Sequence, residues 1–189
     1  MATIDDFFVN PNAVYSEISS GRFEDIESDW DNQRYPDINK NISVEIQDYV
    51  TQTLSKVLAA KVVVQTIFAR VTCRNTPDPP HHIHSDRAMS THACHVYLSK
   101  HWPENSGTSF WRHKDHGSTD SSVIDSSVIT QDTKNREQWI KTFTCQGQYN
   151  RLFVHDANLF HCAEPVGGWG DDATNGRLVL TCFFNLEPL

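Results

Sequence analysis

The chain has 189 residues, 38% of them hydrophobic, which is enough to enclose a single hydrophobic core. Its 24 acidic and 16 basic residues leave a net charge of -8, and the basic residues form no run that could follow a nucleic-acid backbone. This argues against general nucleic-acid binding, although a local pocket for a single base would need few residues. The apolar runs are too short to span a membrane, so no membrane partner is expected.

The N-terminal segment MATIDDFFVNPNAVY carries acidic residues and lacks the basic and apolar stretches of a secretory signal. We therefore expect a cytoplasmic protein. The cysteines are odd in number, widely spaced and free of any CxxC pair, which argues against a disulfide framework and against a structural zinc cluster. We expect them to be small buried hydrophobic side chains: Cys73, Cys94, Cys145, Cys162 and Cys182.

The first strong pattern along the chain is a helix followed by a strand. Apolar residues recur at helical spacing over residues 42–59, which predicts a helix packed on a sheet. The next segment, KVVVQTIFARVTC, is rich in β-branched residues and predicts a strand ending near Cys73. The segment RNTPDPPHH then contains three prolines, which predict a loop that delivers the histidines.

Four further segments predict strands: THACHVYLS, GTSFWRH, NRLFVHD and GRLVLTCFFNL. Residues 114–131 are rich in Ser, Asp and Thr, which predicts an exposed loop before a short helix around residues 132–143. The alternative is that this segment forms a mobile cover over the site. One amphipathic helix followed by many short strands is typical of an α+β protein with a double-sheet barrel or jelly roll.

The sequence HHIHSD places His84 and Asp86 two residues apart, so in extended backbone both side chains can reach one ion. His161, just past a predicted strand, is the candidate third ligand. Two imidazoles and one carboxylate that leave other positions open are the set associated with non-haem Fe(II) oxygen chemistry. His82 is the main competitor to His84, but no acidic residue lies two positions after it. The remaining histidines are expected to be satisfied or solvent-facing: His81, His92, His95, His101, His113, His116 and His155.

Arg177 opens the last predicted strand, where alternation places it on one face with Val179, Thr181 and Phe183. An arginine buried in such a strand is costly unless it meets an anion, and its planar guanidinium suits a carboxylate. The alternative is an arginine at a strand end that reaches solvent.

Taken together and in this order, these features resemble the Fe(II)/2-oxoglutarate-dependent dioxygenase superfamily, most of all its prolyl-hydroxylase-type branch. The resemblance covers residues 62–184. It is carried by His84-x-Asp86, the strand with Tyr97, the segment GTSFW, the segment NRLFVHDANLFH with His161, and Arg177.

The resemblance implies a double-stranded β-helix, a cupin-like barrel, with N-terminal helices packed on one sheet. Residues 1–189 would form a single domain, in which 1–60 give helical support and 61–189 form the barrel. His84, Asp86 and His161 would bind Fe(II). Arg177, Tyr97 and, more weakly, Thr181 would hold 2-oxoglutarate. One departure is Val179, where many relatives have Ser or Thr.

The implied activity is hydroxylation of a C–H bond in a prolyl, amino-acid or small-molecule substrate, with O2 and 2-oxoglutarate consumed and succinate and CO2 released. Asp86 favours hydroxylation, because related halogenases replace the acidic ligand with a small residue. Two alternatives stay open: a cupin-like metalloenzyme without 2-oxoglutarate, including a zinc hydrolase, and a non-catalytic metal-binding sensor module. Substrate identity and oligomeric state are not predicted.

Overall fold

The computed structural model describes residues 1–28 and 32–188. Its helices are α1 (Pro11–Ser19), α2 (Val44–Leu58) and α3 (Ser126–Asp132), with 3-10 turns η1 (Ser121–Val123) and η2 (Arg136–Gln138). Its strands are β1 (Ala2–Ile4), β2 (Glu24–Glu27), β3 (Arg34–Asn39), β4 (Lys61–Thr72), β5 (His92–Tyr97), β6 (Gly107–His113), β7 (Trp139–Gln146), β8 (Arg151–Asp156), β9 (His161–Glu164) and β10 (Arg177–Glu187). Among the described residues, the strands form a seven-stranded sheet in the order β1-β8-β5-β10-β4-β3-β2 and a three-stranded sheet in the order β7-β6-β9.

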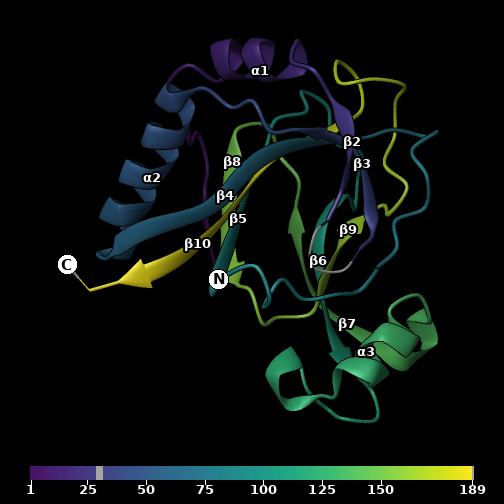
Figure 1. Cartoon of the computed structure of the whole chain (residues 1–189). Helices are drawn as coiled ribbons and strands as arrows, with labels where there is room; N and C mark the ends of the chain where they lie inside the picture. The colour runs from purple at the N-terminus through teal and green to yellow at the C-terminus, as the bar shows by residue number, and fades with distance from the viewer. Residues whose placement is uncertain (29–31, 189) are drawn as a thin grey trace.

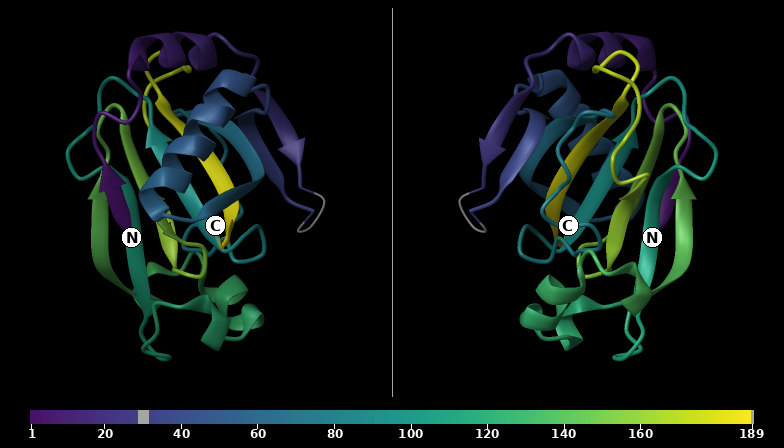
Figure 2. Two further views of the ribbon diagram at one scale, coloured as in Figure 1. Left: turned by 90° about the vertical axis from the view of Figure 1, so that its left-hand side faces the viewer. Right: turned by 90° about the vertical axis from the view of Figure 1, so that its right-hand side faces the viewer.

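The long antiparallel pair of β4 and β10 lies inside the larger sheet, with Arg177 opposite Thr72 and Glu187 opposite Lys61. Alternate residues of β10 point to opposite faces, as the sequence predicts. One set, which includes Leu178 and Leu180, packs in the main core under α1 and α2. Figure 1 shows α2 lying along this face of the sheet, and Figure 2 shows α1 crossing its upper end.

The predicted helix over residues 42–59 is confirmed as α2. Its buried residues Ile46, Val50 and Leu54 recur every four positions, so they form one apolar stripe against the sheet. Ala59 ends the helix in the left-handed conformation at φ 49°, and β4 begins two residues later at Lys61. The predicted boundary between the helix and the following strand therefore agrees with the boundary in the structure.

The inner face of the larger sheet packs against the smaller sheet. Val179, Tyr97 and Phe153 from β10, β5 and β8 share one buried cluster with Phe110 of β6 and Cys145 of β7. Two sheets that face each other across such a core form a jelly roll. The predicted α+β architecture is confirmed, and so are the four further predicted strands, as β5, β6, β8 and β10.

The predicted helix at residues 132–143 is wrong. The helix lies earlier, as α3, where the side chain of Asp125 caps it by accepting from the Ser127 N–H at 2.8 Å. Residues of β7 instead pair with β6, with Trp139 opposite His113. Strand pairing outweighs local helix propensity here, because Trp139 is buried against the apolar cluster under α3.

The first 60 residues, expected as helical support, also supply strands β1, β2 and β3. β1 pairs with β8 and β3 pairs with β4, so these strands extend the larger sheet. Each of the five cysteines is buried and free of a disulfide, as predicted. None of the helices in the described residues is long and apolar enough to cross a lipid bilayer.

Candidate metal centre

The backbone brings the His84 loop and the start of β9 together. His84 and His161 form an antiparallel bridge, in which each N–H donates to the other carbonyl at 3.0 and 2.9 Å. The Asp86 N–H donates to the Ala157 carbonyl at 2.9 Å. These bonds hold residues that are distant in sequence in one fixed register.

The three predicted ligands converge as side chains. The His161 Nε2 lies 3.1 Å from one oxygen of Asp86, and the His84 Nε2 lies 3.6 Å from the other. One donor atom from each residue lies within 4.8 Å of the other two, so the group can hold a metal ion. Two nitrogens and one carboxylate oxygen form the donor set that suits Fe(II) with open positions, and also zinc.

Hydrogen bonds orient both imidazoles toward this point. The Nδ1–H of His84 donates to the His82 carbonyl at 2.9 Å, and the Nδ1–H of His161 donates to the Leu159 carbonyl at 2.9 Å. Each ring therefore turns its Nε2 toward Asp86, as backbone-anchored metal ligands do. The competitor His82 points elsewhere, because its Nε2 lies 2.7 Å from Asp78 Oδ1.

The charges within the triad favour an anionic Asp86 beside neutral His84. Burial raises the pKa of Asp86, but His161 and His84 oppose it and hold that pKa below its usual range. Burial and the neighbouring His161 lower the pKa of His84 to about 4. Burial also lowers the pKa of His161, but the Asp86 carboxylate outweighs this and raises it. A metal ion would take the place of the proton between His161 and Asp86.

Two further histidines, expected to be satisfied or solvent-facing, lie beside His161: His155 is buried and His95 is half-buried. The Nε2 atoms of His95 and His155 are 3.2 Å apart, and the His155 and His161 rings are 4.7 Å apart. His95, His155 and His161 form a second group close enough to hold a metal ion. Strand alternation could have indicated His95, because it shares the face of Tyr97, but nothing local marks it as a neighbour of His161.

Arg177 is buried at 8% exposure, and its Nε has no hydrogen-bond partner among the described residues. One Nη lies 3.5 Å from the Gly107 carbonyl, and the guanidinium lies 5.9 Å from the centre of the Trp102 ring. Burial lowers its pKa to about 10. The predicted alternative of a solvent-facing arginine therefore does not apply.

The other two predicted cosubstrate residues share the inner face with Arg177 but have protein partners. The Tyr97 hydroxyl donates to Thr108 Oγ1 at 2.9 Å, and the Thr181 hydroxyl lies 3.2 Å from His95 Nδ1. The predicted role of both hydroxyls in cosubstrate binding would therefore require a change of partner.

A small cavity of about 60 Å³, called here the inner cavity, has both a triad residue and the buried arginine in its lining. Its lining consists of Arg70, Thr72, Pro79, His81, His82, His84, Ala163, Val166 and Arg177. The cavity thus borders both His84 and Arg177, whereas Tyr97 and Thr181 do not line it.

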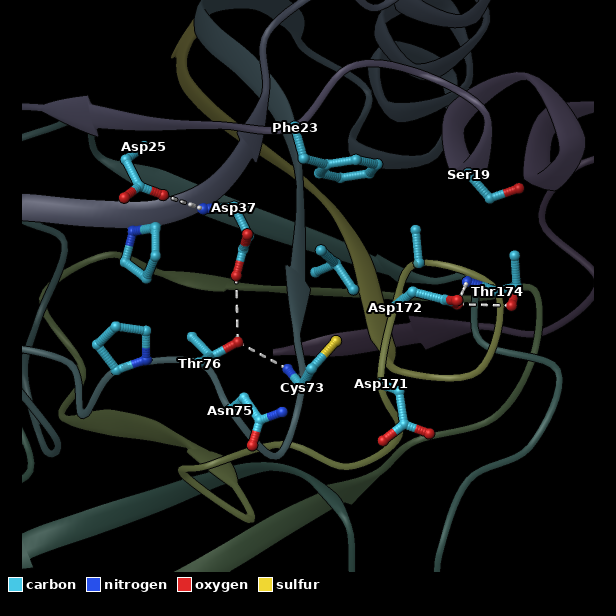
Figure 3. Close-up of a pocket in the computed structure, with 14 residues that line it drawn as sticks. Ser19, Phe23, Asp25, Asp37, Cys73, Asn75, Thr76, Asp171, Asp172 and Thr174 are labelled. Atoms are coloured by element: carbon cyan, nitrogen blue, oxygen red, sulfur yellow. Dashed lines mark hydrogen bonds between the residues drawn. The ribbon is translucent and has the colours of Figure 1, made fainter.

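A larger pocket of about 630 Å³ is lined by residues of β3, the end of β4 and the loop before β10 (Figure 3). Its lining includes Val71 and Cys73, which alternate along the chain with the inner-cavity residues Arg70 and Thr72. Its carboxylates have partners: Asp37, for example, accepts from the Thr76 hydroxyl at 3.2 Å. This pocket is therefore separate from the metal centre.

The fold is similar to that of several solved structures. They include SnoN, a non-heme alpha-ketoglutarate-dependent epimerase from nogalamycin biosynthesis, at a TM-score of 0.60 and 12% identity over 97% of this chain and 75% of SnoN. EctD from S. alaskensis, solved with bound Fe, gives a TM-score of 0.52 and 12% identity over 99% of this chain and 74% of EctD. EvdMO1 gives a TM-score of 0.56 and 15% identity over 98% of this chain and 45% of EvdMO1.

At these identities the similarity establishes the double-stranded β-helix fold and leaves the activity open. No curated protein sequence matches the chain. The model of a family of unknown function, DUF6445, matches residues 1–184, and the chain therefore belongs to that family.

Proposed function

We propose that the chain is an Fe(II)- and 2-oxoglutarate-dependent oxygenase of the prolyl-hydroxylase type. The inner cavity carries this proposal, because its lining contains both His84 of the triad and Arg177, whose buried Nε has no hydrogen-bond partner among the described residues. A cosubstrate with a chelating keto acid at one end and a free carboxylate at the other fits these two features. The similarity of the fold to SnoN and EctD supports the same function class.

The residues of the chain divide the work between binding and exclusion of water. With a metal bound in place of the proton, His84 and His161 would provide neutral Nε2 ligands, and Asp86 would offset part of the metal charge. Arg177 offers a guanidinium to the distal carboxylate of 2-oxoglutarate. When bound, Fe(II) would supply the redox chemistry that couples O2 consumption to conversion of 2-oxoglutarate into succinate and CO2. The buried cluster around Tyr97 keeps the barrel interior dry.

We infer that the reaction is hydroxylation of a C–H bond in a prolyl, amino-acid or small-molecule substrate. Asp86 supports this choice, since it keeps the acidic ligand that halogenases of this kind lack. The fold by itself does not determine the reaction type, because SnoN, which has a similar fold, is an epimerase.

The test is an anaerobic titration of the Fe(II)-loaded protein with 2-oxoglutarate, monitored by visible absorption. Bidentate chelation of iron by the keto acid produces a weak charge-transfer band, which we expect in the wild type. His161→Ala should abolish the band. His101→Ala is the matched control and should keep it, because His101 is exposed and does not line the inner cavity. Absence of the band from the wild type, with iron shown to be bound, would exclude 2-oxoglutarate.

The second candidate is a metalloenzyme that uses three histidines and no 2-oxoglutarate. The observation that favours it is the group formed by His95, His155 and His161, in which the first two Nε2 atoms are already 3.2 Å apart. His161 can give its Nε2 to one ion only, so the two ligand sets exclude each other. The same titration distinguishes the two candidates, because the three-histidine enzyme predicts no charge-transfer band. It also predicts that Asp86→Ala retains the metal.

A further inference from the structure

The inner cavity contains a second arginine, Arg70, that the sequence does not single out. On β4, Arg70 lies opposite Val179 of β10, while Arg177 lies opposite Thr72. The two arginines are therefore diagonal neighbours on the same face of two paired strands, a position that places Cα atoms about 7–8 Å apart. Both line the inner cavity together with His84.

Neither guanidinium has its charge matched by an ion pair with a described residue. The Nε atoms of Arg70 and Arg177 are buried and have no hydrogen-bond partner among the described residues. Burial lowers the pKa of both side chains, and the charge of Arg70 adds to the effect on Arg177. Two like charges side by side in a buried cavity are costly unless an anion joins them.

The nearby groups of Arg70 only partly compensate its charge. Its guanidinium lies 6.0 Å from the centre of the Tyr35 ring. The charge of Asp37 favours the protonated arginine, but this carboxylate lines the larger pocket and accepts from Thr76 there (Figure 3). No described carboxylate forms an ion pair with Arg70 or Arg177.

The rest of the lining also suits an anion. Besides the two arginines, the lining consists of three histidines and of neutral residues, and none of its described members is acidic. A carboxylate between two guanidiniums can accept hydrogen bonds from both planar forks.

We propose that Arg70 and Arg177 together bind one carboxylate of a small dicarboxylate in the inner cavity. The identification of this dicarboxylate as 2-oxoglutarate rests on the proposed function, whereas the two-arginine site itself does not. Arg70 would thus be a direct anion-binding residue rather than a structural one.

The test measures binding of two probes by calorimetry. Glutarate, titrated into metal-free protein, reports the arginine site alone, because it lacks the keto group that chelates a metal. 2-Oxoglutarate, titrated with Mn(II) present, reports the arginine site and the metal centre together. The variants are Arg70→Met, which keeps the aliphatic stem, Arg70→Lys, which keeps the charge, and Arg177→Met. Arg74→Met is the control, since the exposed Arg74 side chain lies outside the inner cavity and forms an ion pair with Asp171 at 3.8 Å.

We expect Arg70→Met and Arg177→Met each to weaken glutarate binding about 10- to 100-fold, the loss of a hydrogen bond to a charged group. Arg70→Lys should lie between Arg70→Met and the wild type, and Arg74→Met should bind as the wild type does. Ligand-free Arg70→Met should melt no lower than the wild type, because it loses a half-buried charge that forms no ion pair with a described carboxylate. A purely structural Arg70 would lower the melting temperature instead.

Unchanged affinity of Arg70→Met for both probes would overturn the two-arginine site, and so would a wild type that binds neither probe. The proposed function fails in a different way. If glutarate binding depends on both arginines but Mn(II) does not increase the affinity for 2-oxoglutarate, the anion site stands and the 2-oxoglutarate oxygenase does not.

Discussion

His82 and His84 show how strongly the direction of one side chain depends on its neighbours. Both belong to the same loop and both have the residue type of a metal ligand. The His82 ring turns to Asp78, whereas the His84 ring turns to Asp86 and His161. The His82 carbonyl then fixes the His84 ring through Nδ1. One histidine thus orients the other through its backbone.

At this scale, Arg177→Ala tests cosubstrate binding. We expect the apparent KM for 2-oxoglutarate to rise about 10- to 100-fold with a smaller change in kcat, because a hydrogen bond to a charged group contributes about 1.5–3 kcal/mol. The measurement is 2-oxoglutarate consumption by the Fe(II) protein without a prime substrate. Arg22→Ala, whose side chain is 82% exposed, is the control. An unchanged KM in Arg177→Ala would remove this residue from the cosubstrate site.

Among the elements, the segment around α3 is tied to the metal-binding loop. The Thr133 hydroxyl donates to the Ile83 carbonyl at 2.8 Å and accepts from the His82 N–H at 3.0 Å. The Ile83 N–H donates to the Thr133 carbonyl at 3.0 Å. Ile83 also packs under α3 in one apolar cluster with Phe160, the residue before His161. Movement of this segment would therefore disturb His84.

We predict that Thr133→Val weakens metal binding, because it removes both hydroxyl bonds to the loop while keeping the side-chain shape. The stability cost is about 1–3 kcal/mol, and the Mn(II) affinity should fall as the loop loosens. The measurements are chemical unfolding and Mn(II) titration. Thr133→Ser keeps the hydroxyl and should behave as the wild type does. If Thr133→Val loses stability but binds Mn(II) normally, the contact supports the fold and not the metal centre.

In the whole molecule, the triad lies where the two sheets meet. Asp86 and His84 come from the loop between β4 and β5 of the larger sheet, and His161 opens β9 of the smaller sheet. A bound ion would therefore link segments that the chain separates widely. An ion that binds the folded state and not the unfolded state stabilises the folded protein by mass action.

We expect Mn(II) at about 100 times its Kd to raise the melting temperature of the wild type by about 5–10 °C. Asp86→Ala should show no such shift, because it loses the anionic ligand. Thermal unfolding with Mn(II) and with EDTA measures the difference. Asp78→Ala, which removes an exposed carboxylate from the same loop, should keep the shift. A full Mn(II) shift in Asp86→Ala would remove this residue from the metal centre and favour the three-histidine set.

The sequence alone predicted those features that depend on local periodicity. The apolar stripe of α2, the alternation of β10 and the proline-rich loop before His84 can each be recognised within a short window. The His84-x-Asp86 pair was recognisable for the same reason, since both side chains follow from one extended segment. Even the candidate roles of His161 and Arg177 follow from the order of these residues along the chain rather than from their contacts.

Only the tertiary structure decided which residues meet across the barrel. Five strands have short or irregular sequence patterns, and it is pairing with neighbouring strands that makes them extended: β1, β2, β3, β7 and β9. Arg70 faces the inner cavity because β4 lies beside β10, and His95 and His155 reach His161 because β5 and β8 are paired neighbours. Local patterns determine the face on which a side chain lies, but strand order determines what lies opposite, and that order depends on burial of the whole core.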